Sequence, residues 1–283
     1  MRWEGRAESG NVEDRRGMGR GGMRMGLPVG GGIGGVVLLL LVSALTGQNP
    51  LDLIGGSTDQ GSYSEPDPNA PQATDPQSRF MRVVLKDTED TWTSVFRSSG
   101  QQYEAPTLVL FSDATDTACG LGQSAMGPFY CPPDRKVYLD TSFFEELDQR
   151  FGAPGDFAQA YVIAHEIGHH VQNLLGLSER VQSARQRVSR AEGNALSVRL
   201  ELQADCYAGV WGHYAAQHDL LSPGDAEEGL RAAAAIGDDR LQRQGQGRVA
   251  PESFTHGSSE QRMSWLRRGL ESGRIDSCDT FRE

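Results

Sequence analysis

The sequence predicts an α+β domain that follows an N-terminal membrane-spanning helix. Three observations predict this fold class: an uncharged apolar stretch near the N-terminus, short strand-like segments between residues 107 and 140, and long helical patterns on both sides of them. The chain has 283 residues, and the part after residue 77 is long enough to enclose a core of its own.

The first 26 residues form an Arg- and Gly-rich tail, in which arginines outnumber acidic residues. Residues 27–46 then carry no charge, and they contain the most hydrophobic run of the chain, Val36–Val42. About 20 such residues are one membrane span, so we expect a transmembrane anchor here.

The distribution of basic residues predicts how this anchor is oriented. Arginines precede it, and the next basic residue is Arg79, so the N-terminus is expected in the cytoplasm and the rest of the chain outside. This makes the protein a single-pass protein of the cell membrane. A cleaved signal peptide is the alternative, but the charged region is long and Ser43–Thr46 is a poor cleavage site.

Residues 47–77 read as a disordered linker, because they are rich in Gly, Ser, Pro, Asp and Gln and poor in bulky apolar residues. Residues 78–283 are the expected domain. The formal net charge is −11 and no basic patch follows the tail, which argues against nucleic acid as a partner.

Periodicity places the elements of this domain. An amphipathic helix over 78–98 precedes a short apolar strand over 107–111. Residues 127–131 and 136–140 flank a Pro-Pro-Asp-Arg turn and read as a hairpin. Helical patterns follow over 143–150, 157–175, 178–190, 200–211, 225–244 and 263–270.

The helix over 157–175 carries the most informative motif, His165-Glu166-Ile167-Gly168-His169. Asp156 is suited to the N-cap, and Gly176 follows the expected end. His165 and His169 are four residues apart, so both imidazoles project from one face and can bind one Zn²⁺. Glu166 lies about 100° round the helix, where a general base can stand beside the metal without binding it.

A core helix with satisfied polar residues is the alternative interpretation. The flanking residues are apolar, so the helix is expected to be buried. Two histidines and a glutamate buried on such a helix need a reason, and a metal site provides one. The motif together with its context therefore favours zinc.

A third metal ligand is expected downstream. Glu201 and Asp205 share one face of the apolar helix over 200–211, and two buried carboxylates repel unless a cation or a donor lies between them. We assign Glu201 as the ligand and Asp205 as the acceptor for the other ring N–H of His165. The rival ligands are Cys206, Asp205 itself, His170 and His213.

Two further features have a functional and a structural interpretation. His256, just ahead of a Ser-capped helix, either donates a hydrogen bond to the oxyanion of a peptide carbonyl under attack or is a structural cap. Tyr130 and Tyr138 are weaker choices for this donor. Met126–Tyr130 is either a sheet edge that holds substrate as an added strand or an ordinary covered edge.

The four cysteines, an even number outside the membrane, predict two disulfides. Cys119–Cys131 is the local pairing and leaves Cys206–Cys278; the alternative is four reduced, buried thiols.

The chain resembles the bacterial family described as putative neutral zinc metallopeptidases. The resemblance rests on Arg2-Trp3, Asn11–Gly17, Gly127–Pro132, Val137–Thr141, His165–Gln172, Glu201–Trp211, His256–Ser258 and Cys278–Phe281. It implies a zincin-type metallopeptidase held at the cell membrane, with His165, His169 and Glu201 as ligands and Glu166 as base.

These features lead to one functional hypothesis, a membrane-anchored α+β zincin, most simply an endopeptidase, that uses Zn²⁺ to hydrolyse bonds in a protein or peptide substrate. One alternative is a zinc-stabilised, membrane-tethered binding module without catalysis, which the presence of Glu166 disfavours. Another is a metal hydrolase for non-peptide substrates, which fits the same ligands.

Overall fold

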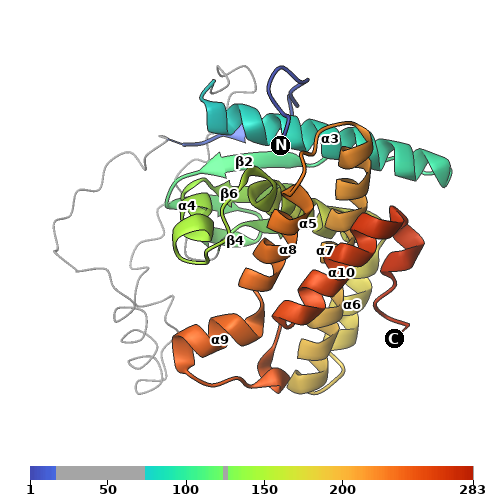
Figure 1. The fold of residues 1–283 in the computed structure, drawn as a ribbon. Coiled ribbons are helices and arrows are strands. Elements are labelled where there is room, and N and C mark those ends of the chain that lie inside the picture. Colours follow the sequence, from blue (N-terminus) through green and yellow to red (C-terminus); the bar gives the residue numbers. More distant parts are fainter. Residues whose placement is uncertain (17–73, 124–126, 283) are drawn as a thin grey trace, which may run out of the picture. The chain divides into compact units, whose positions relative to one another are not determined.

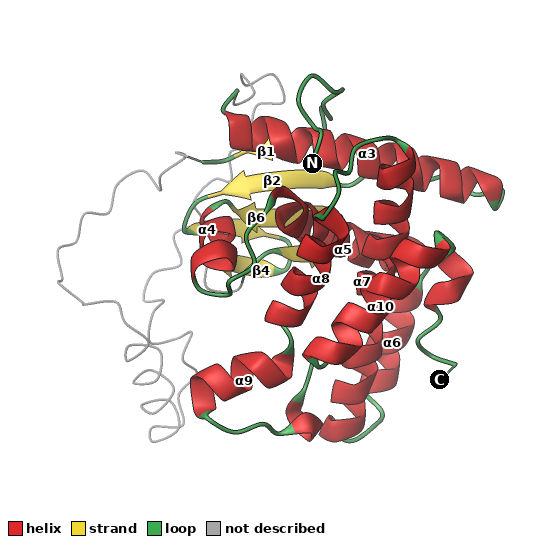
Figure 2. Ribbon diagram, viewed as in Figure 1, coloured by secondary structure: helices red, strands yellow, loops and turns green. Residues whose placement is uncertain are grey.

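The computed structural model describes residues 1–16, 74–123 and 127–282. Figures 1 and 2 show the α+β fold that was predicted, with a small sheet and a larger set of helices. None of the helices in the described part of the chain combines the length and the hydrophobicity needed to cross a bilayer. The predicted span over 27–46 and nearly all of the predicted linker lie outside the described residues.

The main sheet has four strands in the order β1-β2-β6-β5. Parallel pairing joins β1 (Val12–Asp14) to β2 (Thr107–Phe111) and β2 to β6 (Lys136–Asp140), and β5 (Phe129–Cys131) pairs antiparallel with β6. The predicted strand over 107–111 and the predicted hairpin are thus present. A second antiparallel pair, β3 (Ala114–Thr117) and β4 (Gly120–Gln123), was not predicted, because its residues are polar and Gly-rich.

The first 16 residues belong to the domain, so their prediction as part of a separate tail is wrong. Val12 pairs with Leu108 in the sheet, and the amide of Arg2 donates to the carbonyl of Leu220. Residues 1–17 and 70–283 accordingly form one compact unit. The cause is pairing between segments far apart in sequence, which local composition does not reveal.

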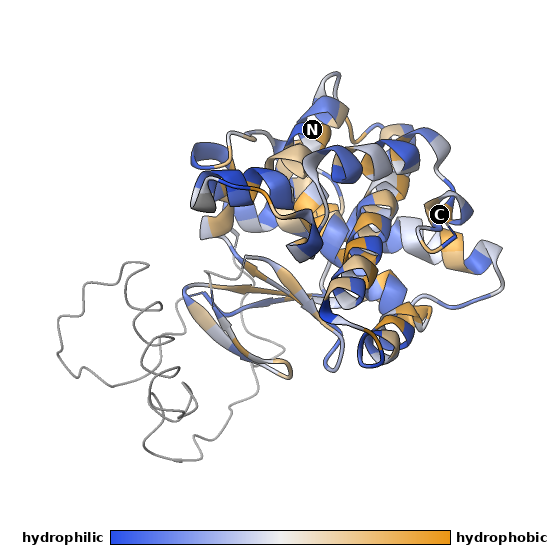
Figure 3. Cartoon of the chain, turned by 90° about the horizontal axis from the view of Figure 1, so that it is seen from below, coloured by the Kyte–Doolittle hydropathy of each residue, from blue (hydrophilic) through white to orange (hydrophobic). Residues whose placement is uncertain are grey.

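In Figure 1, α3 (Pro76–Ser98) lies above β2 and most of the other helices lie beside and below the sheet. Hydrophobic and hydrophilic residues alternate along the helices in Figure 3, as expected for helices with one buried side. The other helices are α4 (Ser142–Gln149), α5 (Asp156–Leu174), α6 (Leu177–Arg185), α7 (Arg190–Gln217), α8 (Asp225–Ala235), α9 (Asp238–Gln246) and α10 (Ser259–Ser272), with 3-10 turns η2 (Pro251–Ser253) and η3 (Ile275–Cys278).

Two local predictions need correction. Asp156 is the first helical residue of α5 and not its N-cap, because Gly155 occupies the cap position without a side-chain bond. The single helix expected over 225–244 is broken between α8 and α9. The break turns the chain so that the Asp238 carboxylate reaches the loop before α10, where it accepts the amide hydrogens of Thr255, His256 and Gly257.

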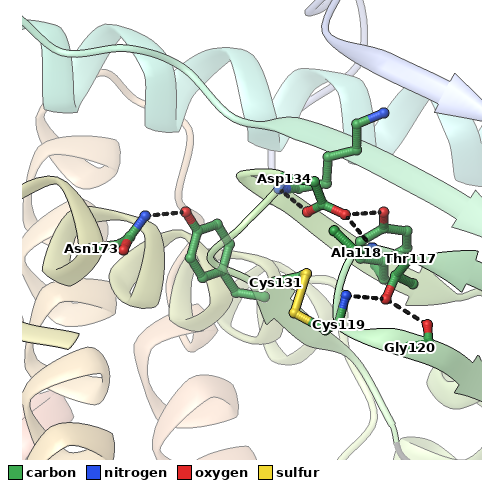
Figure 4. The surroundings of a disulfide bond; sticks show 10 residues. Thr117, Ala118, Cys119, Gly120, Cys131, Asp134 and Asn173 are labelled. Carbon is green, nitrogen blue, oxygen red and sulfur yellow. Dashed lines mark hydrogen bonds between the residues drawn. A yellow bond between two sulfur atoms is a disulfide. The ribbon is translucent and has the colours of Figure 1, made fainter. Parts of the chain in front are cut away.

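Both predicted disulfides are present. Cys206–Cys278 ties α7 to η3, and Cys119–Cys131 ties the β3–β4 turn to β5 (Figure 4). Next to the first of these, α7 and α10 approach closely at Gly209 and Gly269. A Cβ on Gly269 would lie 2.0 Å from the Cys206 carbonyl, so only glycine allows this approach. The close packing brings residues of α10 to the centre of the fold.

Candidate metal centre

The motif His165–His169 lies on α5, and α7 crosses it at Gly168. A Cβ on Gly168 would lie 2.9 Å from the Ala204 carbonyl, so the glycine inside the motif lets α7 approach the two histidines. The predicted ligand Glu201 lies one turn before Ala204 on α7 and therefore faces α5.

Three side chains that were predicted as ligands converge between the two helices. Glu201 Oε2 lies 3.2 Å from His165 Nε2, and Glu201 Oε1 lies 3.4 Å from His169 Nε2. One ligand atom from each of the three residues lies within 4.8 Å of the others. The carboxylate therefore stands between two imidazole nitrogens, which is the arrangement that a shared cation requires.

The other face of His165 is held by a buried polar cluster. His165 Nδ1 lies 2.8 Å from Asp205 Oδ1, the contact expected from the sequence. Tyr161 donates to the same oxygen at 2.6 Å, and Arg262 donates to both carboxylate oxygens at 2.9 Å. Because the ionised carboxylate only accepts, Nδ1 carries a hydrogen, and in the neutral ring the lone pair is on Nε2, the nitrogen that faces Glu201.

The electrostatics of the site favour a positive charge between the ligands. Burial by itself would lower the pKa of His165, but the carboxylates of Asp205 and Glu201 outweigh it and raise the pKa to about 10. The pKa of His169 is raised in the same way, chiefly by Glu201 against burial. Burial would raise the pKa of Glu201, yet the two imidazoles hold it well below its usual value. A metal cation can take the place of these protons.

A cleft of about 870 Å³ opens over these residues. Glu166 lines it together with the three predicted ligands, and among the described residues its carboxylate has no hydrogen-bond partner. Gly127–Tyr130 line the cleft as well, next to and within β5, which is an edge of the sheet. Met126, the first residue of the predicted substrate edge, lies outside the described residues.

His256 also lines the cleft, and Asp238 holds it there. His256 Nδ1 lies 3.2 Å from Asp238 Oδ1, and this hydrogen bond raises the pKa of the imidazole above its usual value. Asp238 Oδ2 also accepts three main-chain amides of the same loop. Burial would raise the pKa of this carboxyl, but the hydrogen bond and charge of His256, together with main-chain amides of the loop, lower it. The helix that follows is capped by Ser258 and Gln261, so the cap does not use His256.

The alternative candidates for metal ligand and for oxyanion donor have other partners in the structure. His170 contacts the Glu104 carbonyl and the Tyr130 hydroxyl, and burial lowers its pKa to about 4. A neutral His170 donates to the carbonyl and accepts from Tyr130, which leaves that hydroxyl without a free hydrogen. Tyr138 donates to Asp134, His213 contacts the Leu270 carbonyl, and Cys206 is in a disulfide.

Comparison with known proteins identifies the family. The model of the family described as "Putative neutral zinc metallopeptidase" matches residues 1–281. The chain belongs to this family. It is 52% identical to the protein YpfJ of Escherichia coli strain K12, over 99% of both chains. It is 45% identical to the protein Rv2575 of Mycobacterium tuberculosis strain H37Rv, over 72% of both chains. No solved structure matches the chain.

Sequence reasoning missed three residues that shape the site: Arg262, Asp238 and Gln172. Arg262 has one sequence signal, because it is a charged residue beside the apolar positions of an amphipathic helix. Gln172 has a positional signal, because it lies three residues after His169 on the same helix. Asp238 has no such signal, since its partners belong to the loop before α10.

Proposed function

We propose that the protein is a zinc-dependent peptidase that uses Glu166 as general base and His256 as a donor to the oxyanion. The convergence of His165, His169 and Glu201 at the base of a cleft carries this proposal. Membership of a zinc metallopeptidase family supports it.

The ligand set fits Zn²⁺. His165, His169 and Glu201 would hold the ion through two imidazole nitrogens and one carboxylate, and three protein ligands are typical of catalytic zinc sites, whereas structural sites have four. When bound, Zn²⁺ polarises the scissile carbonyl and makes water a stronger acid. A set of three ligand residues among the described residues disfavours the alternative of a purely structural zinc site in a binding module.

Glu166 supplies the base. It is one residue from the first ligand, so its carboxylate faces the cleft beside the ligands and not toward α7. It takes a proton from the attacking water and returns that proton to the leaving amine. The lack of a hydrogen-bond partner for Glu166 among the described residues leaves both carboxylate oxygens available for this transfer.

His256 supplies the positive charge that the oxyanion needs. Its Nδ1 is bound to Asp238, so Nε2 is the nitrogen available to the cleft. Because the pKa of His256 is raised, the ring is protonated over a wider pH range and Nε2–H can donate to the carbonyl oxygen.

The cleft favours an extended peptide as substrate. β5 pairs on one side with β6, and its other side has no partner strand among the described residues. An extended chain can therefore add to β5 through main-chain hydrogen bonds, with Gly127–Tyr130 beside it. This supports a peptide over a compact non-peptide substrate.

The proposal places the domain outside the cytoplasm, attached to the membrane through residues 27–46. Two disulfides support an oxidising compartment. Because Val12–Asp14 pair with β2, the proposal places the N-terminus in that compartment as well, and residues 27–46 would then attach to the membrane without crossing it once.

Cleavage of a peptide library by the purified full-length chain tests the function. We expect cleavage that a chelator abolishes and added Zn²⁺ restores. A zinc-loaded, folded protein that hydrolyses no peptide in the library would reject the proposal and favour the binding module. Hydrolysis of esters or phosphoesters without peptide cleavage would favour the non-peptide hydrolase.

A further inference from the structure

A buried chain of side-chain amides connects the metal ligand His169 to the disulfide-bonded Cys278. His169 Nδ1 lies 2.9 Å from Gln172 Oε1. Gln172 Nε2 lies 2.7 Å from the Leu200 carbonyl oxygen and 3.1 Å from Gln203 Oε1, and Gln203 Nε2 lies 3.0 Å from the Cys278 carbonyl oxygen. Gln172 and Gln203 are 0% and 4% exposed, so water does not compete for these groups.

Main-chain carbonyls fix the direction of every hydrogen bond in this series of side-chain amides. A carbonyl oxygen only accepts, so the Cys278 carbonyl requires the amide NH₂ of Gln203 to face it. The side-chain oxygen of Gln203 is then left to accept from Gln172. In the same way, the Leu200 carbonyl requires the amide NH₂ of Gln172 to face it. Two independent acceptors therefore give both amides one orientation.

This orientation determines the tautomer of His169. The oxygen of Gln172 faces Nδ1 of His169, and because it only accepts, Nδ1 carries the hydrogen. The lone pair of the neutral ring is then on Nε2, the nitrogen that lies 3.4 Å from Glu201. Asp205 imposes the same tautomer on His165, so both rings present Nε2 to one point.

We infer that Gln172 is a positioning residue for the zinc site, and that Gln203 and the Cys206–Cys278 disulfide hold Gln172 in place. The disulfide fixes the segment that carries the Cys278 carbonyl against α7, so its integrity contributes to zinc affinity. The inference rests on the proposed zinc site, and it adds a connection between that site and a bond that redox conditions can break.

Zinc affinity of the purified full-length chain tests this inference, by competition with a chelator. Gln172→Met removes both ends of the amide, and we expect its Kd for zinc to rise about 10- to 100-fold, with a changed absorption spectrum of the Co²⁺-substituted site. Gln203→Met has a smaller effect, because the Leu200 carbonyl still orients Gln172. Gln182→Met is the control with the same change of side chain. Gln182 lines the cleft over the metal site but takes no part in the hydrogen-bonded amides.

The two disulfides provide a second comparison. We expect the Cys206→Ala/Cys278→Ala variant to bind zinc more weakly than the Cys119→Ala/Cys131→Ala variant, whose disulfide does not touch the amide chain. A folded Gln172→Met protein with the Kd and Co²⁺ spectrum of the original chain would overturn the inference, as would equal zinc affinity of the two disulfide variants. If Gln172→Met does not fold, the zinc affinities of Gln203→Met and of the two disulfide variants test the inference in its place. A chain that binds zinc but cleaves no peptide would reject only the proposed function.

Discussion

Arg262 holds both oxygens of the Asp205 carboxylate: Nε donates to Oδ2 and Nη2 donates to Oδ1, each at 2.9 Å. Both side chains are buried, at 3% and 0% exposure. Arg262 Nη2 also donates to the Tyr161 hydroxyl at 3.1 Å. The guanidinium thus places the carboxylate that orients His165, and it offsets the negative charge that Asp205 brings into the core.

Arg262→Met should destabilise the protein strongly. The substitution leaves the Asp205 carboxylate buried without its main cationic partner, which costs about 3–5 kcal/mol of unfolding free energy. Urea denaturation measures this loss. Arg262→Lys keeps the charge but loses the two-pronged geometry, so we expect an intermediate loss. An Arg262→Met protein as stable as the original would show that Asp205 does not depend on this pair.

Glu166→Gln should lower turnover strongly and leave zinc bound. The amide cannot accept a proton, so we expect kcat to fall about 10²- to 10⁴-fold. Peptide cleavage measures the loss, and elemental analysis measures the zinc content. Glu179→Gln is the control, because Glu179 lines the same cleft but lies on α6, outside the metal motif. Normal cleavage by Glu166→Gln would mean that the base is another group.

The parts of the site that the sequence reveals are those set by helix periodicity. The four-residue spacings of His165–His169 and Glu201–Asp205 put each pair on one helix face, and the apolar context predicted that the two faces meet. These roles stay predictions until metal binding is measured. The strand over 107–111, the hairpin of β5 and β6, and both disulfide pairings were also predictable, from apolar runs around a turn and from the sequence proximity of two cysteines.

The parts that the sequence does not reveal depend on contacts between distant elements. Arg262 reaches Asp205 only because α7 and α10 pack closely at two glycines. Asp238 reaches the His256 loop only because the chain breaks between α8 and α9. β1 has three residues and no alternating apolar pattern, so its place in the sheet follows from pairing with β2 alone.

His256 and Asp238 predict a specific pH dependence of catalysis. The protonated imidazole is the donor, so activity persists below the pKa of His256 and is lost as pH rises through it. Asp238 raises that pKa. Asp238→Asn removes the negative charge, so the alkaline limb of kcat against pH should move to lower pH. Rates across a pH series measure the shift.

His256→Ala should lower kcat about 10²- to 10³-fold, because a donor to the oxyanion is lost. His218→Ala is a matched control: His218 also pairs with an aspartate, Asp87, at 3.1 Å, but it does not line the cleft. If Asp238→Asn leaves the alkaline limb unmoved while the protein remains active, His256 is a structural residue only.

The pairing of β1 predicts that the N-terminus and the domain lie on the same side of the membrane. Arg16 binds Asp75 at 2.7 Å, and Glu8 binds Arg79 at 3.0 Å, so the chain before residue 17 and the chain after residue 74 are in direct contact. A folded domain with these contacts cannot have a bilayer between them. We expect a cysteine at Glu4 to react with a membrane-impermeant maleimide in intact spheroplasts whenever a cysteine at Gln149 does.

The four native cysteines are all in disulfides, so they do not react with the maleimide, and each introduced cysteine is the free thiol that is labelled. Glu4 and Gln149 are both exposed in the folded domain, so accessibility to the reagent reports the side of the membrane and not burial. Labelling at both positions places the whole domain outside, and protection at both places it inside. Labelling at Gln149 with protection at Glu4 would restore the single crossing expected from the sequence, and it would require β1 to be absent from the sheet.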